Sequence, residues 1–129
     1  MDEPIWILKR TALSMHSQQL TLHGGSDGIR DETLLDSALA KPLNVFAYEE
    51  GVNLFRLAAS YAFGIARNHA FVDGNKRTAL AVSAVFLVRN GWDIEASKEE
   101  LYLTFLHLAD GSLGEQELAA WLAAHSVQL

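Results

Sequence analysis

The sequence predicts an all-α protein, a compact bundle of about six helices around a central antiparallel pair with a polar loop between its two members. Two segments, Asn53 to Asn68 and Asn75 to Asn90, are apolar nearly all round. A helix without a polar face belongs in the interior of a bundle. No stretch sustains the apolar and polar alternation of a β-strand. Small side chains would let the two helices pack closely, namely Ala58, Ala59, Ala62, Ala81 and Ala84.

Two helices are expected before this pair. From about Thr11 to Leu22, apolar residues lie near one helical stripe, and the glycines of HGGSDG end the segment. Asp31 to Lys41 starts with acids and ends on a lysine, in line with the helix dipole. Pro42 directly follows and is a stop signal. The stretch PLNVFAY, Pro42 to Tyr48, is therefore expected to be extended or irregular.

Two helices are also expected after the pair, at about Lys98 to Ala109 and Leu113 to His125. Each is preceded by the S-x-x-E pattern of a capping box, in which a serine and a glutamate satisfy backbone N–H groups at a helix start. The two patterns are Ser97 with Glu100 and Ser112 with Glu115.

Length and composition predict one ordinary domain, residues 1–129, of a cytoplasmic protein. Half of the 129 residues are hydrophobic and there is no cysteine, which excludes disulfides and thiolate metal sites. The first residues include two acids, the reverse of a secretory signal. The longest nearly uncharged apolar run, Thr78 to Val88, is far short of the ~20 residues that cross a bilayer.

The charge distribution favours a small anion over nucleic acid as a ligand. The net charge of −6 opposes general binding to a polyanion. From Leu54 to Asn90, however, five cations face one acid, a balance of +4, while the remainder carries five cations and fifteen acids, a balance of −10. Such a positive island can collect a nucleotide even when the whole molecule is acidic.

The stretch HAFVDGNKR, residues 69 to 77, concentrates polar groups at the start of the second apolar helix. The first N–H groups of that helix have no intrahelical partner, and the helix dipole makes this end positive. Gly74 has no Cβ, so a phosphate could approach the backbone, and Asn75 could donate through its amide. Lys76 and Arg77 add two charges. The sequence therefore predicts a phosphate site at this helix start.

The remaining residues of the stretch supply chemistry around such a phosphate. Asp73 could hold Mg²⁺, which typically binds one or two carboxylates together with phosphate oxygens. His69 could accept a hydroxyl proton near neutral pH, and Phe71 would point inward and anchor the loop. These parts match phosphoryl or nucleotidyl transfer, in which positioning and electrostatics dominate catalysis.

Plainer interpretations of the same residues stay open. His69 could be a structural histidine, and Asp73 could be only the N-cap of the following helix. Lys76 and Arg77 could be a solvated pair, although cations in a first turn oppose the helix dipole. GGSDG around Ser26 matches the nucleophile-elbow pattern, but that elbow needs a preceding strand, so a turn is expected there.

The stretch HAFVDGNKRTA resembles the signature loop of the Fic/Doc (Fido) superfamily, whose core pattern is H-x-F-x-[DE]-[GA]-N-x-R. The likeness continues through LHGGSDGIRDETLLDSAL, YEEGVNLFRLAASYAFGIARNHAF and TALAVSAVFLVRNGW, and thus over most of the chain. It is greatest to the Doc, or death-on-curing, branch of toxins from toxin–antitoxin pairs. The resemblance implies the Fido fold, with Pro42 to Tyr48 as the flap that clamps an extended target segment.

The resemblance also implies a role for each residue of the loop. His69 would be the base, Asp73 would hold Mg²⁺, and Gly74, Asn75 and Arg77 would bind the phosphates of ATP. Lys76 stands where AMP-transferring members usually have glycine, and Doc-type proteins share the lysine.

The lysine therefore favours transfer of the γ-phosphate over transfer of AMP, and the resemblance to Doc implies a threonine of elongation factor Tu as the acceptor, which would inhibit translation. Restraint would come from a Phd-like antitoxin. AMP transfer is the alternative, and a catalytically inactive helical module that binds a partner is an alternative of another class.

Overall fold

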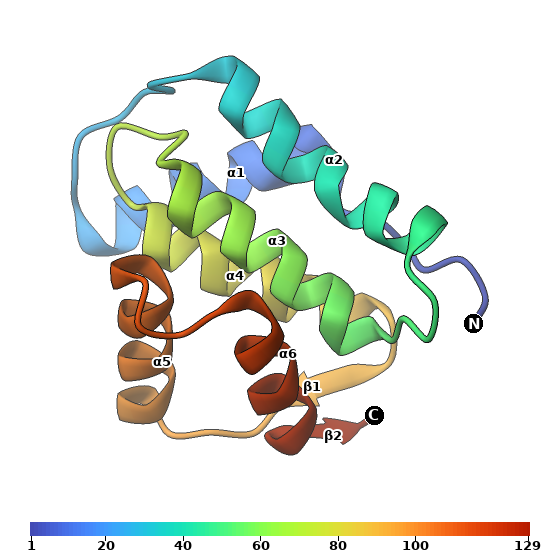
Figure 1. Cartoon of the computed structure of the whole chain (residues 1–129). Helices are drawn as coiled ribbons and strands as arrows, with labels where there is room; N and C mark the ends of the chain where they lie inside the picture. Colours follow the sequence, from blue (N-terminus) through green and yellow to red (C-terminus); the bar gives the residue numbers. More distant parts are fainter.

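The computed structural model describes residues 1–129 and consists of six helices and one small sheet (Figure 1). The elements in chain order are α1 (Lys9–His23), α2 (Glu32–Tyr48), α3 (Leu54–Asn68), α4 (Asn75–Arg89), β1 (Trp92–Ile94), α5 (Lys98–Asp110), α6 (Glu115–Ala124) and β2 (Ser126–Gln128). The prediction of an all-α bundle is confirmed.

The central antiparallel pair is α3 and α4, as predicted. These two helices make the most extensive contact in the molecule, and α3 also packs on α2 and α6 (Figure 1). Asn53 caps α3 by accepting a hydrogen bond from the backbone N–H of Arg56 at 2.8 Å. Most of α3 is buried, including three of the predicted small residues, Ala58, Ala59 and Ala62. The fold thereby fixes the loop between α3 and α4 at one end of the core.

The expectation that Pro42 ends α2 is wrong, because the helix continues to Tyr48. A proline inside a helix removes one hydrogen bond and costs about 3 kcal/mol. Burial beyond the proline offsets this cost, since Val45 and Phe46 pack against the core and Phe46 meets the Trp6 ring edge-on at 5.6 Å. The residues expected to form an extended flap are therefore helical.

The small sheet was also not predicted. Strands β1 and β2 are antiparallel, with Asp93 opposite Val127, and each has only three residues. Trp92 packs on Phe55 with the ring centroids 5.1 Å apart. Three residues are too few to display the alternation by which a strand is recognised in a sequence.

One of the two predicted capping boxes is correct. Ser97 and Glu100 cap α5 reciprocally. At α6, however, the N-cap is Gly114, whose N–H donates to the Glu117 carboxylate at 3.0 Å. Ser112 instead donates to Asp110 at 2.6 Å. The box predicted from Ser112 and Glu115 is therefore wrong.

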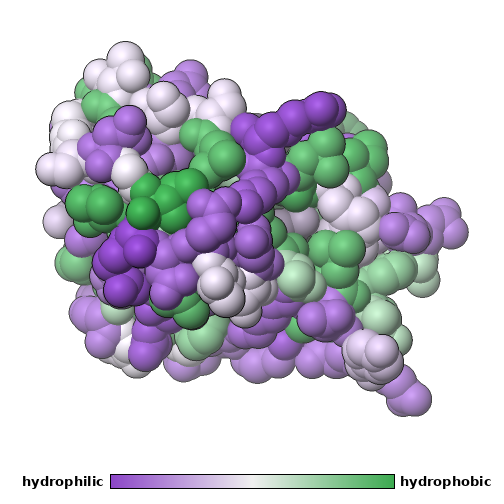
Figure 2. Space-filling model, turned by 90° about the horizontal axis from the view of Figure 1, so that it is seen from above, coloured by the Kyte–Doolittle hydropathy of each residue, from purple (hydrophilic) through white to green (hydrophobic).

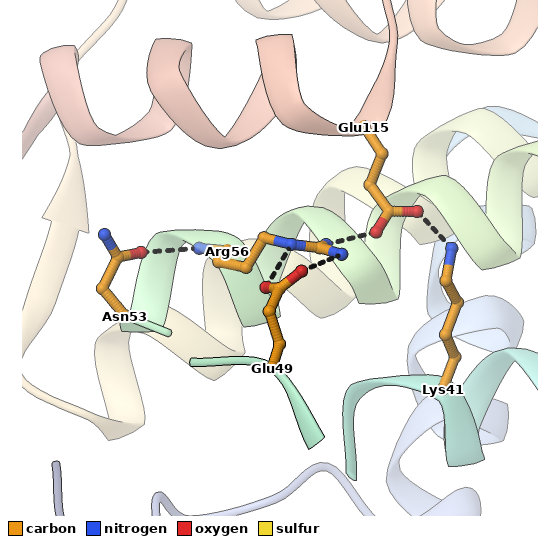
Figure 3. Close-up of polar contacts among 5 residues, drawn as sticks. All are labelled: Lys41, Glu49, Asn53, Arg56 and Glu115. Carbon is orange, nitrogen blue, oxygen red and sulfur yellow. Dashed lines mark hydrogen bonds and ion pairs between the residues drawn. The ribbon is translucent and has the colours of Figure 1, made fainter. Parts of the chain in front are cut away.

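Glu115 is displaced from that capping role by an ion-pair network that joins α6 to α2 and α3 (Figure 3). One of its carboxylate oxygens contacts Lys41 and the other contacts Arg56, which also pairs with Glu49 at 2.9 Å. Burial lowers the pKa of Arg56, but hydrogen bonds and charge from Glu115 and Glu49 outweigh it and the pKa is raised. The network ties three helices together away from the loop.

No helix has the length and apolar character needed to span a bilayer. The face shown in Figure 2 mixes hydrophilic and hydrophobic surface. The exposed large hydrophobic residues are scattered over several elements, among them Tyr48 in α2, Val72 in the loop, and Tyr102 in α5.

Candidate active site

The loop between α3 and α4 begins and ends with residues in the left-handed backbone region. His69 has φ 49° and ψ 49° and follows the last residue of α3. Gly74 has φ 78° and ψ 16° and is the N-cap of α4. The left-handed region costs a non-glycine residue about 1–2 kcal/mol, so the histidine must be held in place by its surroundings. These two reversals turn the chain sharply enough for α4 to return along α3.

The N-terminus of α4 is left open. No side chain caps it, and its first turn contains no acid. The first hydrogen bond that closes the helix runs from the N–H of Thr78 to the carbonyl of Gly74 at 3.0 Å. The backbone N–H groups of Asn75, Lys76 and Arg77 therefore have no partner within the protein. Two cationic side chains in this turn, both exposed, strengthen an already positive end.

Asp73 does not cap this helix. One carboxylate oxygen accepts the N–H of Gly74 at 2.8 Å, and the other accepts the N–H of Ser26 at 3.3 Å. The N-cap interpretation of Asp73 is therefore wrong, because its contacts lie ahead of the first helical turn. The carboxylate remains exposed beside the open N–H groups.

The side chain of Asn75 has a structural task that the sequence did not reveal. Its oxygen accepts the N–H of Phe71 at 3.1 Å, and its nitrogen donates to the Phe71 carbonyl at 3.0 Å. The side chain is buried, and its amide closes the loop on itself. One of the two N–H donors of this amide is therefore used within the loop, and the predicted contact with a phosphate falls to the other. The backbone N–H of Asn75 has no hydrogen-bond partner within the protein.

The base of the loop rests on His16 of α1. Phe71, 1% exposed, stacks on the His16 ring with centroids 3.7 Å apart and planes 8° apart. The Nε2 atom of His16 lies 2.7 Å from the carbonyl oxygen of Asp73, so Nε2 carries the proton and donates it. His16 belongs to the helix expected from about Thr11 to Leu22, but nothing in the sequence indicated which residues it would hold.

A cavity of about 940 Å³ opens above the start of α4, within the range of small-molecule sites. Residues 69 and 72–77 form one side, and apolar residues of α5 such as Leu101 and Phe105 form the other. All predicted phosphate and metal residues, together with His69, thus share one cavity. Asp110 is at its edge, where hydrogen bonds from Ser112 lower the pKa of the carboxyl. No group of three or more His, Cys, Asp or Glu could hold a metal alone, so a metal here would need ligand oxygens besides Asp73.

His69 itself is exposed, and its ring makes no hydrogen bond within the protein. Its backbone is bound instead. The guanidinium of Arg30 donates through Nε to the His69 carbonyl at 2.6 Å and through Nη2 to the Asn68 carbonyl at 3.0 Å. Arg30 was not singled out in the sequence, since nothing local shows that it returns to the loop.

The segment around Arg30 pairs with the loop as a short antiparallel bridge between Ile29 and Phe71. The hydrogen bonds of this bridge run from Arg30 to Ala70 and from Val72 to Gly28, at 2.7 and 3.0 Å. The N–H and C=O of Ile29 consequently point away from the loop and have no backbone partner. A free strand edge therefore lies beside His69, in the segment after α1 rather than in the predicted flap.

Comparison with known proteins agrees with these features. Residues 6–87 match the family model described as Fic/DOC family. "Protein kinase doc" of Escherichia phage P1 is 36% identical over 92 residues, which are 71% of this chain and 73% of that protein. "Toxin Doc" of Mycolicibacterium smegmatis is 45% identical over 74 residues, which are 57% of each chain.

Proposed function

Because the chain belongs to the Fic/DOC family, we propose that it is a Doc-like toxin that transfers the γ-phosphate of ATP to a threonine hydroxyl of a translation factor. The observation that carries this proposal is the open start of α4. Three unpartnered N–H groups and two cationic side chains meet there, at a cavity that also holds His69. Anions bind at such helix ends without further adaptation.

The cavity fits a nucleotide with its phosphates on α4. The triphosphate would lie over the N–H groups of residues 75 to 77 with Lys76 and Arg77 at its sides. Asp73 is the one carboxylate among the loop residues that line the cavity. It would hold Mg²⁺, which supplies charge neutralisation when bound. The apolar side chains of α5 on the opposite wall suit the flat base.

In the proposed reaction, the target hydroxyl oxygen bonds to the γ-phosphorus while the bond to the bridging oxygen breaks. ADP leaves with that electron pair, and the hydroxyl proton passes to the imidazole of His69. The free ring nitrogens of His69 suit this role because no other side chain occupies them. The backbone edge at Ile29 would align an extended target segment by strand pairing.

Lys76 favours phosphate transfer over AMP transfer. It stands at the cavity wall in the first turn of α4, where AMP-transferring relatives usually have glycine. A long cation there takes up space and adds charge at the distal phosphates. One of the two relatives is also named a kinase. We propose elongation factor Tu as the target and a Phd-like antitoxin as the restraining partner, in keeping with the resemblance to Doc toxins.

Two labelled nucleotides test the reaction. The protein is incubated with elongation factor Tu, magnesium and ATP labelled at either the γ- or the α-phosphate. We expect label on the target from γ-labelled ATP alone. Label from the α-position alone would contradict the kinase proposal and identify AMP transfer.

The His69→Ala variant separates an enzyme from a binding module. We expect growth arrest on expression of the unaltered chain and none with the variant. Equal arrest by both proteins, or arrest by neither, would favour a catalytically inactive module that acts by binding a partner. Because His69 is exposed and its ring bonds to nothing, this replacement should leave the fold intact.

A further inference from the structure

Arg30 binds three consecutive carbonyl groups at the end of α3. Its Nη2 donates to Asn68 and its Nε to His69, at 3.0 and 2.6 Å. Its backbone N–H donates to the carbonyl of Ala70 at 2.7 Å. A single residue from the segment after α1 therefore binds the backbone carbonyls of His69 and of the residues immediately before and after it.

The carbonyls of Asn68 and His69 would otherwise lack partners, whereas that of Ala70 also accepts the N–H of Asp31 at 3.0 Å. The last carbonyls of a helix have no intrahelical donor, and helices commonly end with a glycine in the left-handed region whose following N–H groups satisfy them. Here the left-handed residue is His69, and it makes no such backbone bond. The guanidinium replaces the missing donors with charge-assisted hydrogen bonds, and its positive charge also suits a helix C-terminus.

We propose that Arg30 is the positioning residue for the base of this enzyme, because it fixes the left-handed backbone from which the His69 ring extends. Arg30 does not touch the nucleotide site, since it is absent from the cavity wall. It acts only through the backbone of residues 68 to 70. The inference rests on the proposed function only in taking His69 as the base.

The location of Arg30 also links the base to the target. Ile29, whose backbone edge is free, immediately precedes Arg30, and both belong to the segment that pairs with the loop. The same few residues would therefore position both the target segment, which is aligned on that edge, and the imidazole that accepts its proton. Proton transfer requires hydrogen-bond reach, and a displacement of about 1 Å can cost about 100-fold in rate.

The test compares Arg30→Met with Arg30→Lys and with a matched control, Arg10→Met. Methionine keeps an unbranched stem but donates no hydrogen bond, and lysine keeps the charge but cannot form the fork. Arg10 is an exposed arginine of α1 with no hydrogen bond or ion pair from its side chain. All three substitutions are at exposed positions, so folded protein is expected in each case.

We expect Arg30→Met to lower kcat about 100-fold while KM for ATP stays within about twofold, because α4 and Asp73 are untouched. Arg30→Lys should recover only a small part of the rate, and Arg10→Met should match the unaltered protein. An unchanged kcat in Arg30→Met would overturn the proposal. So would a fall in kcat accompanied by a rise in KM for ATP of the same size.

A second readout does not depend on activity. The NMR order parameter of the His69 amide should fall from a rigid value of about 0.85 towards about 0.6 in Arg30→Met and stay high in Arg10→Met. A rigid His69 amide in Arg30→Met would refute the positioning role even if the protein proves to have no transferase activity. Conversely, loss of rigidity at the His69 amide in Arg30→Met, with no transfer by any of the proteins, would support the positioning of the His69 backbone by Arg30 and refute the proposed function.

Discussion

Adding a single methyl group at Gly25 should weaken the binding of magnesium and leave the binding of ATP to the rest of the nucleotide site unchanged. Gly25 has φ +122°, and a Cβ added there would lie 2.8 Å from Oδ2 of Asp73 and 3.0 Å from the Leu20 side chain. Gly24 is the matched control, because it has φ +79° in the same turn and a Cβ there would have nothing within 4 Å. Both glycines adopt backbone conformations that L-residues rarely take.

The magnitudes follow from these contacts. Alanine in such a backbone region costs about 1–3 kcal/mol, so each variant should lower the melting temperature by roughly 4 °C per kcal/mol. Carbon and oxygen in contact normally lie about 3.3 Å apart, so the Gly25→Ala methyl overlaps the Asp73 carboxylate by about 0.5 Å. The carboxylate must turn and release the N–H of Ser26. We expect the affinity for magnesium ATP to fall about tenfold, which is 1.4 kcal/mol.

Calorimetric titration with ATP, once in magnesium and once in a chelator, measures the part of the affinity that depends on the metal and the part that does not. In magnesium, Gly25→Ala should bind about tenfold more weakly than Gly24→Ala, and in the chelator the two variants should bind alike, because the N–H groups of α4 are unaltered. Equal affinities of the two variants in magnesium would refute the assignment of Asp73 as the residue that holds the metal. Thermal unfolding of both variants checks that their backbone strain is comparable.

Three further changes test what holds the molecule together. Asn75→Ala leaves the buried N–H and C=O of Phe71 without partners and should cost about 1–3 kcal/mol in urea unfolding. Glu115→Gln should cost about 1–2 kcal/mol, because Lys41 loses its counter-charge and the partly buried Arg56 keeps only that of Glu49, whereas the control Glu32→Gln at an exposed pair should cost less than about 1 kcal/mol. Burial raises the pKa of Tyr61, so the unfolded chain ionises first and stability should fall as pH rises above about 10. Tyr61→Phe should remove this contribution to the loss of stability at alkaline pH. The measurement is the difference between the free energies of unfolding in urea at about pH 8 and about pH 11.

The elements that the sequence predicted well are those whose signals are local. Asn53 and Gly74 flank α3 and α4, and the observed bounds differ from the predicted ones by one residue at most. The capping box at Ser97 was found because serine and glutamate stand three residues apart and bond to each other's backbone. A pattern of that kind needs no knowledge of the rest of the chain.

The elements that it missed depend on distant partners. Pro42 stays inside α2 because Val45 and Phe46, beyond it, pack on the core. Glu115 does not cap α6 because Lys41 and Arg56, more than fifty residues away, take its carboxylate. Tertiary burial and long-range charge pairs outweigh a stop signal or a cap worth about 1–3 kcal/mol, and neither can be read from a short window.

The same distinction divides the residues of the loop by task. Asn75, the Asp73 carbonyl and the His69 carbonyl are occupied by contacts within the protein, with Phe71, His16 and Arg30 respectively. The three N–H groups of α4 and the His69 ring have no such contacts. Groups bonded inside the fold stabilise it, so their loss should appear in unfolding measurements. Groups left open contribute nothing to folding and remain free for a substrate, so their loss should appear in transfer rates and leave stability unchanged. A motif of nine residues can therefore serve both purposes because different atoms of it carry each one.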